Sequence, residues 1–125
     1  MKTRIILGAV LAAVCGVVIL IAQQRPAGPY TADQVGAGRA AFQTNCASCH
    51  AANLSGAEGP ELAGSNFLAQ WGDRTAAALI NFMQSTMPPG GAALPGDTYV
   101  NIAAFILDAN SARPGDRVLL RTQTW

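Results

Sequence analysis

Lysine, histidine and charged side chains in general are scarce in this sequence. Its 125 residues include one lysine, Lys2, one histidine, His50, and only 12% charged residues. Beyond residue 22, six arginines face seven acidic residues, which gives a formal net charge of −1. Such a domain has no electrostatic basis for binding nucleic acid. The length also excludes a large multidomain enzyme, because about 100 residues beyond an apolar leader support one modest core.

Strand-like alternation of apolar and polar residues is absent as well, and the apolar residues recur at helical spacing. We predict a first helix that is capped by Thr31 or Asp33 and ends at Asn45. A second helix is predicted over residues 74–86, with Asp73 as its cap. A third is predicted from Gly96 and Asp97 to Asn110. Residues 53–66 are predicted as a loop with one short turn after Pro60. The sequence therefore indicates an all-α fold with three principal helices and long loops. A domain this small with such loops needs a disulfide, a metal or a cofactor to complete its core.

Each predicted helix has an apolar side. These sides are Val35, Gly38, Phe42 and Asn45 in the first helix, Ala76, Leu79, Ile80 and Met83 in the second, and Val100, Ala103, Ala104 and Leu107 in the third.

An uncharged apolar run occupies residues 5–22, directly after Lys2 and Arg4. As a helix it would be about 27 Å long, close to the thickness of a bilayer core. Positive residues before an apolar run are typical of an export signal, so residues 1–22 are either a cleaved signal peptide or an uncleaved membrane anchor, with the anchor favoured. Residues 23–30 are predicted as a linker, 31–110 as the folded domain and 111–125 as a tail. We expect a periplasmic domain, tethered to the inner membrane where the N-terminal hydrophobic helix is retained.

The segment Cys46-Ala47-Ser48-Cys49-His50 has the spacing of the attachment signature of c-type haem. Cysteines three apart lie on one side of a helical turn, where both sulfurs reach the vinyl groups at one porphyrin edge, and the next residue is carried under the iron. Other interpretations are a disulfide, a thioredoxin-like redox pair and a zinc site. The redox pair lacks its strand and helix scaffold, and the zinc site lacks a usual fourth ligand. We therefore predict one haem c, bound covalently through Cys46 and Cys49, with His50 as a ligand of its iron.

The other side of the iron has few candidate ligands. Because His50 is the single histidine, a bis-histidine haem within one chain is excluded. Methionine is the common partner of histidine in electron-carrying cytochromes. Met83 lies at helical spacing with Leu79 and Ile80 and is predicted to fill the core. Met87 precedes two prolines in a stiff loop, and we predict it as the second axial ligand; without it, the iron would be five-coordinate and open to small ligands.

At these residues the chain resembles the class I, mitochondrial-like c-type cytochromes, over about residues 33–110. Beyond the haem motif, the matching residues are Gly38 and Phe42, the segment Gly59-Pro60-x-Leu62-x-Gly64, Met87-Pro88 and residues 104–107. The resemblance implies that the first and last helices cross at Gly38, against Phe105, and that the carbonyl of Pro60 orients His50. It also implies haem contacts for Leu62, and a propionate contact for Trp71 or Arg74.

The stretch from Cys46 to the MPPG segment looks like the small cytochromes that accept electrons from pyrroloquinoline-quinone (PQQ) alcohol dehydrogenases. This likeness implies a PQQ-dependent dehydrogenase as donor and a respiratory acceptor such as a terminal oxidase. The domain beyond residue 22 contains no lysine. We therefore expect docking through an apolar patch near the haem edge rather than through a ring of positive charge.

The function predicted from the sequence is electron transfer by a monohaem c-type cytochrome that is not itself an enzyme. One alternative is a five-coordinate haem protein that binds a small ligand or peroxide. Another is a fixed electron-transfer subunit of a membrane respiratory complex. Residues 111–125 either pack on the domain or dock a partner subunit.

Overall fold

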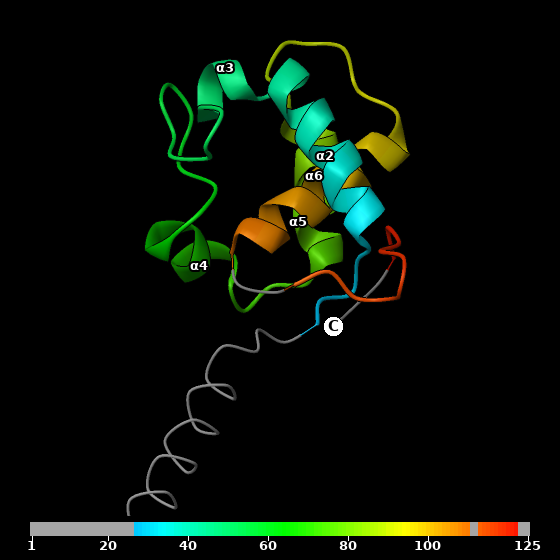
Figure 1. Ribbon diagram of the computed structural model, residues 1–125. Coiled ribbons are helices and arrows are strands. Elements are labelled where there is room, and N and C mark those ends of the chain that lie inside the picture. Colours follow the sequence, from blue (N-terminus) through cyan, green and yellow to red (C-terminus); the bar gives the residue numbers. More distant parts are fainter. Residues whose placement is uncertain (1–26, 111–112, 123–125) are drawn as a thin grey trace, which may run out of the picture.

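A computed structural model describes residues 27–110 and 113–122, and this part of the chain holds five helices (Figure 1). They are α2 (Ala32–Asn45), α3 (Ala47–His50), α4 (Ser65–Trp71), α5 (Ala76–Thr86) and α6 (Gly96–Ala109). Within these ranges there is no strand, only one isolated bridge between Ala27 and Arg113. The all-α prediction is confirmed. Two short helices join the three principal ones, and α4 was not predicted.

Local signals at the helix starts explain two of the boundaries. Thr31 caps α2, since its hydroxyl accepts from the Gln34 N–H at 3.2 Å, and the Gln34 side chain accepts in return from the Thr31 N–H. Thr75 caps α5 by accepting from the Ala78 N–H at 3.1 Å. The prediction that Asp73 is the cap of this helix was wrong, because the Thr75 hydroxyl makes the capping hydrogen bond and α5 begins at Ala76, the first residue of its apolar side.

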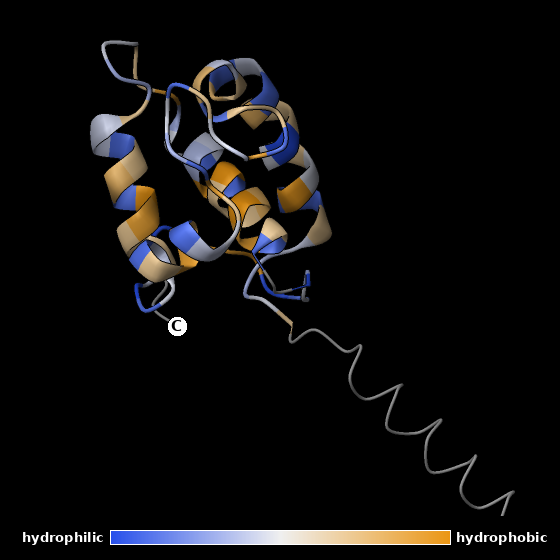
Figure 2. Ribbon diagram, turned by 90° about the vertical axis from the view of Figure 1, so that its left-hand side faces the viewer, coloured by the Kyte–Doolittle hydropathy of each residue, from blue (hydrophilic) through white to orange (hydrophobic). Residues whose placement is uncertain are grey.

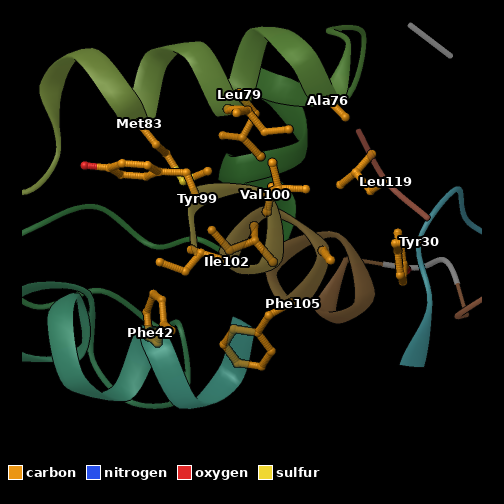
Figure 3. Close-up of a cluster of buried hydrophobic side chains, with 14 of the residues drawn as sticks. Tyr30, Phe42, Ala76, Leu79, Met83, Tyr99, Val100, Ile102, Phe105 and Leu119 are labelled. Carbon is orange, nitrogen blue, oxygen red and sulfur yellow. The ribbon is translucent and has the colours of Figure 1, made fainter. Parts of the chain in front are cut away.

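The core lies where α2 and α5 pack on α6 (Figures 1 and 3). The predicted apolar sides of α2 and α5 face this core, with Phe42 and Ile80 fully buried. In α6 the buried set is wider than one side and also includes Tyr99, Ile102, Phe105 and Ile106. The hydropathy colouring of Figure 2 shows α6 as an orange segment between the other helices. A helix surrounded in this way buries nearly all of its faces.

Gly38 lies at the crossing of α2 and α6. A Cβ atom there would stand 1.8 Å from the Asn101 carbonyl oxygen, so only hydrogen permits this approach. The crossing partner was predicted to be Phe105. The glycine in fact contacts the backbone one turn earlier, whereas the Phe105 ring packs on Phe42, with 5.4 Å between ring centroids, and under the guanidinium of Arg39.

Both ends of the described chain are held to the domain. Tyr30, which falls in the predicted linker, is fully buried. The amide of Gly28 donates to the Arg113 carbonyl, and that of Gly115 donates to the Tyr30 carbonyl, both at 2.7 Å. Leu119 is 1% exposed and exchanges two hydrogen bonds with the Gln34 side chain. The described part of the tail therefore packs on the domain.

We expect Leu119→Ala to lower the free energy of unfolding by roughly 2–5 kcal/mol, because it removes a buried side chain where the tail meets the core. Leu120→Ala is the matched control, since the neighbouring leucine is 58% exposed, and its effect should stay within about 0.5 kcal/mol. Denaturant unfolding of the two variants measures both values. Equal effects would show that the tail does not contribute through Leu119.

No helix among residues 27–110 and 113–122 is long and apolar enough to cross a bilayer. The apolar run predicted as a signal or anchor, residues 5–22, lies outside the described residues, as do Ser111, Ala112 and the last three residues of the tail.

Candidate functional site

The motif residues lie on the short helix α3, which follows α2 after a single residue. Cys46 is the C-cap of α2 and the N-cap of α3, and its carbonyl accepts from the amides of Cys49, at 3.1 Å, and His50, at 3.0 Å. One helical turn therefore carries both cysteines, as their spacing predicts. The two thiols are not joined to each other. Partial burial of Cys46, and secondarily the nearby Cys49, raise the pKa of the Cys46 thiol above its ordinary value.

The His50 ring is oriented by the loop that follows it. Its Nδ1 atom lies 2.8 Å from the carbonyl oxygen of Pro60, which can only accept, so Nδ1 is the donor. Of the two neutral tautomers, only the one with its lone pair on Nε2 fits this contact. Gly59 makes this arrangement possible, because a Cβ atom there would stand 2.7 Å from the imidazole ring. This hydrogen bond is the one that the family resemblance implies. A histidine held in this tautomer is prepared to bind a metal through Nε2.

A mostly apolar cleft opens between α3, α4, α5 and α6. It holds about 940 Å³ of empty space, part of which is open solvent at its mouth. The predicted residues that line it are Cys46, Cys49, His50, Pro60, Leu62, Trp71 and Met87. Further walls come from residues that the sequence did not single out for the site, namely Phe67, Phe82, Leu94, Tyr99, Ile102 and Ile106. Their spacing gave no signal beyond that of ordinary core residues.

Met87 is the first residue after α5 and is partly buried at the cleft wall. Met83, one turn earlier, is 7% exposed and belongs to the core, as predicted, but it also borders the cleft. Both methionines therefore border the cleft, but they belong to different elements. Met83 lies within the packed helix α5, whereas Met87 begins the loop between α5 and α6.

Trp71 and Arg74 form a stacked pair at one side of the cleft. The guanidinium carbon of Arg74 lies 5.0 Å from the centre of the Trp71 ring, which in turn packs on Phe82 at 5.2 Å. Trp71 lines the cleft, whereas Arg74 lies in a neighbouring depression beside Thr75 and Leu107. The structure therefore brings Trp71, but not Arg74, to the cleft with the motif residues.

The donor set and the shape of the cleft together fit haem c. Two thiols and an oriented imidazole stand at one end of a cleft whose remaining lining is almost uncharged, with Glu61 as the acidic exception. Among residues 27–110 and 113–122, no group of three or more His, Cys, Asp or Glu side chains is placed to hold a bare metal ion. An apolar macrocycle with a central metal suits this lining better than a hydrated ion does.

Comparison with known families agrees with this geometry. Residues 33–106 match the family model described as cytochrome C oxidase, cbb3-type, subunit III. No individual curated protein matches the chain significantly. The match covers more than half of the sequence and includes the haem motif and most of α2 and α6. The chain therefore belongs to this family of cytochrome c domains, which carry electrons through haem c rather than catalyse a reaction on a substrate.

Proposed function

We propose that this protein is a periplasmic electron carrier with one haem c, attached through Cys46 and Cys49 and ligated by His50 and Met87. The observation that carries the proposal is the pairing of His50 Nδ1 with the Pro60 carbonyl at 2.8 Å, which leaves Nε2 available beside two unpaired cysteines. The position of Met87 also supports the proposal, because this residue directly follows the C-terminal end of α5 and lines the same cleft. When bound, haem c would supply an iron that alternates between the ferrous and ferric states.

The chain's own residues would contribute position and a dry environment. Pro60 and Gly59 hold the imidazole, and the mostly apolar walls, including Leu62, would exclude water from around a bound haem. Two protein ligands would keep the coordination change small between oxidation states, which favours rapid electron transfer. No protein acid, base or nucleophile is required for this function.

The absorption spectrum of the holoprotein tests the proposal directly. We expect a low-spin spectrum with the weak near-infrared band of a methionine ligand in the oxidised form, and no response of the reduced form to carbon monoxide. A high-spin spectrum that shifts with carbon monoxide would instead favour an open iron and a ligand-binding function.

Trp71 is proposed to hold a haem propionate through its indole N–H, with the Arg74 guanidinium packed over its ring. The cleft lining and the 5.0 Å cation–π contact support this pairing. Trp71→Phe keeps an aromatic ring but removes the N–H donor, so we expect a shifted midpoint potential and lower thermal stability of the holoprotein. An unchanged potential and unchanged stability would remove Trp71 from the haem site.

For partners, we propose a PQQ-dependent dehydrogenase as donor and a terminal oxidase as acceptor. The sequence likeness described above supports the donor, and the oxidase named in the family description supports the acceptor. We further propose that residues 5–22 tether the domain to the inner membrane. Separation of cells into membrane and soluble fractions, followed by purification of the full chain, tests the acceptor and the tether. Stable recovery from membranes with an oxidase indicates a fixed subunit. Recovery from the soluble fraction without a partner contradicts the tether.

A further inference from the structure

The loop between α5 and α6 has few internal contacts of its own. Residues 87–95 contain three prolines, which have no N–H to donate, and two glycines. The backbone hydrogen bond recorded within this loop joins the Gly91 amide to the Pro88 carbonyl at 3.1 Å. Met87 stands at the start of this segment, so its position depends on contacts from elsewhere in the domain.

The Met87 amide donates to the Met83 carbonyl at 2.8 Å, and Met87 packs on the edge of the core. The side chain that bonds both ends of the loop is Tyr99, in the first turn of α6. Its hydroxyl donates to the Met87 carbonyl at 2.6 Å and accepts from the Leu94 N–H at 3.1 Å. One oxygen atom therefore joins the beginning of the loop to its end. Figure 3 shows the Tyr99 ring reaching past Met83 toward the C-terminal end of α5.

Tyr99 is itself well fixed. It is 3% exposed and belongs to α6, the helix on which both α2 and α5 pack. A hydroxyl on so buried a ring has little freedom to move away, and its donor and acceptor capacities are both used. The loop is therefore attached to α6, a largely buried helix, through Tyr99, which itself lines the cleft.

We propose that Tyr99 is a positioning residue that keeps Met87 at the iron against competing ligands. The inference rests on the proposed function, in which Met87 is the axial ligand. Without the hydroxyl, the loop keeps its prolines and the bond from the Met87 amide to Met83, but it loses the Tyr99 bonds at both of its ends, so Met87 can move away from the cleft more readily. Residues that orient a metal ligand commonly change the apparent affinity of a site by roughly 10- to 100-fold.

Titration of the oxidised holoprotein with imidazole tests this role, with loss of the near-infrared methionine band as the readout. Tyr99→Phe keeps the buried ring and removes only the hydroxyl. We expect imidazole to displace Met87 at about a tenfold lower concentration than in the unmodified protein. Tyr30→Phe is the matched control, because Tyr30 is also a fully buried tyrosine but does not line the cleft, and its titration should be unchanged.

Amide hydrogen exchange of the reduced holoprotein provides a second readout that does not depend on ligand displacement. We expect the Leu94 amide to be protected in the unmodified protein and in Tyr30→Phe, and to exchange faster in Tyr99→Phe. Identical imidazole titrations for all three proteins would overturn the inference, as would equal exchange at Leu94. If the unmodified protein lacks the methionine band, the proposed ligation by Met87 fails instead, and the two failures are thereby distinguished.

Discussion

Gly38→Ala is expected to destabilise the holoprotein by about 3 kcal/mol or more, at the upper end of the cost of overpacking a well-packed core. The added Cβ atom would stand 1.8 Å from the Asn101 carbonyl oxygen and 2.4 Å from its carbon, both of which are backbone atoms. Backbone within a helix cannot rotate away as a side chain can. The two helices would have to separate, which weakens the contact between the N-terminal and C-terminal parts of the domain.

Gly36→Ala is the matched control for this experiment. Gly36 lies in the same helix, but a Cβ atom there has no neighbour within 4 Å. Alanine has the higher helix propensity, so this variant should be more stable by roughly 0.5–1 kcal/mol. Denaturant unfolding, followed by far-ultraviolet circular dichroism, measures both effects. If the two variants were equally stable, close approach of α2 and α6 at Gly38 would not be a requirement of the fold.

Met87→Ala is expected to abolish the near-infrared methionine band, to lower the midpoint potential and to make the reduced protein bind carbon monoxide. Removal of the thioether leaves one side of the iron without a protein ligand, and a methionine ligand raises the potential of a haem relative to other arrangements. The helices should be unaffected, because Met87 lies after the end of α5. Absorption spectroscopy and redox titration of the same sample measure all three effects.

Met83→Leu provides the control, because this change conserves volume in a buried core position and usually costs less than about 1.5 kcal/mol. We expect it to keep the methionine band. The opposite pattern, with the band lost in Met83→Leu and kept in Met87→Ala, would identify Met83 as the ligand. That result would also contradict the positioning role inferred for Tyr99.

The sequence alone determined the features that depend on residues close together in the chain. The spacing of Cys46, Cys49 and His50 predicted one helical turn, and α3 supplies it. Apolar residues at intervals of three and four predicted the principal helices to within two residues at each end, since helical periodicity is a local property. The proline pair after Met87 likewise predicted the end of α5.

Only the tertiary structure decided which of these elements meet. Gly38 approaches Asn101 rather than Phe105, and Arg74 lies outside the cleft that Trp71 lines. Tyr99 gave no sequence signal beyond that of a core tyrosine, yet its hydroxyl bridges Met87 and Leu94. Periodicity specifies which face of a helix is apolar, but the axial offset and rotation of packed helices depend on how all the side chains interlock. Contacts between residues distant in the chain follow from that packing, so they could not be predicted from spacing alone.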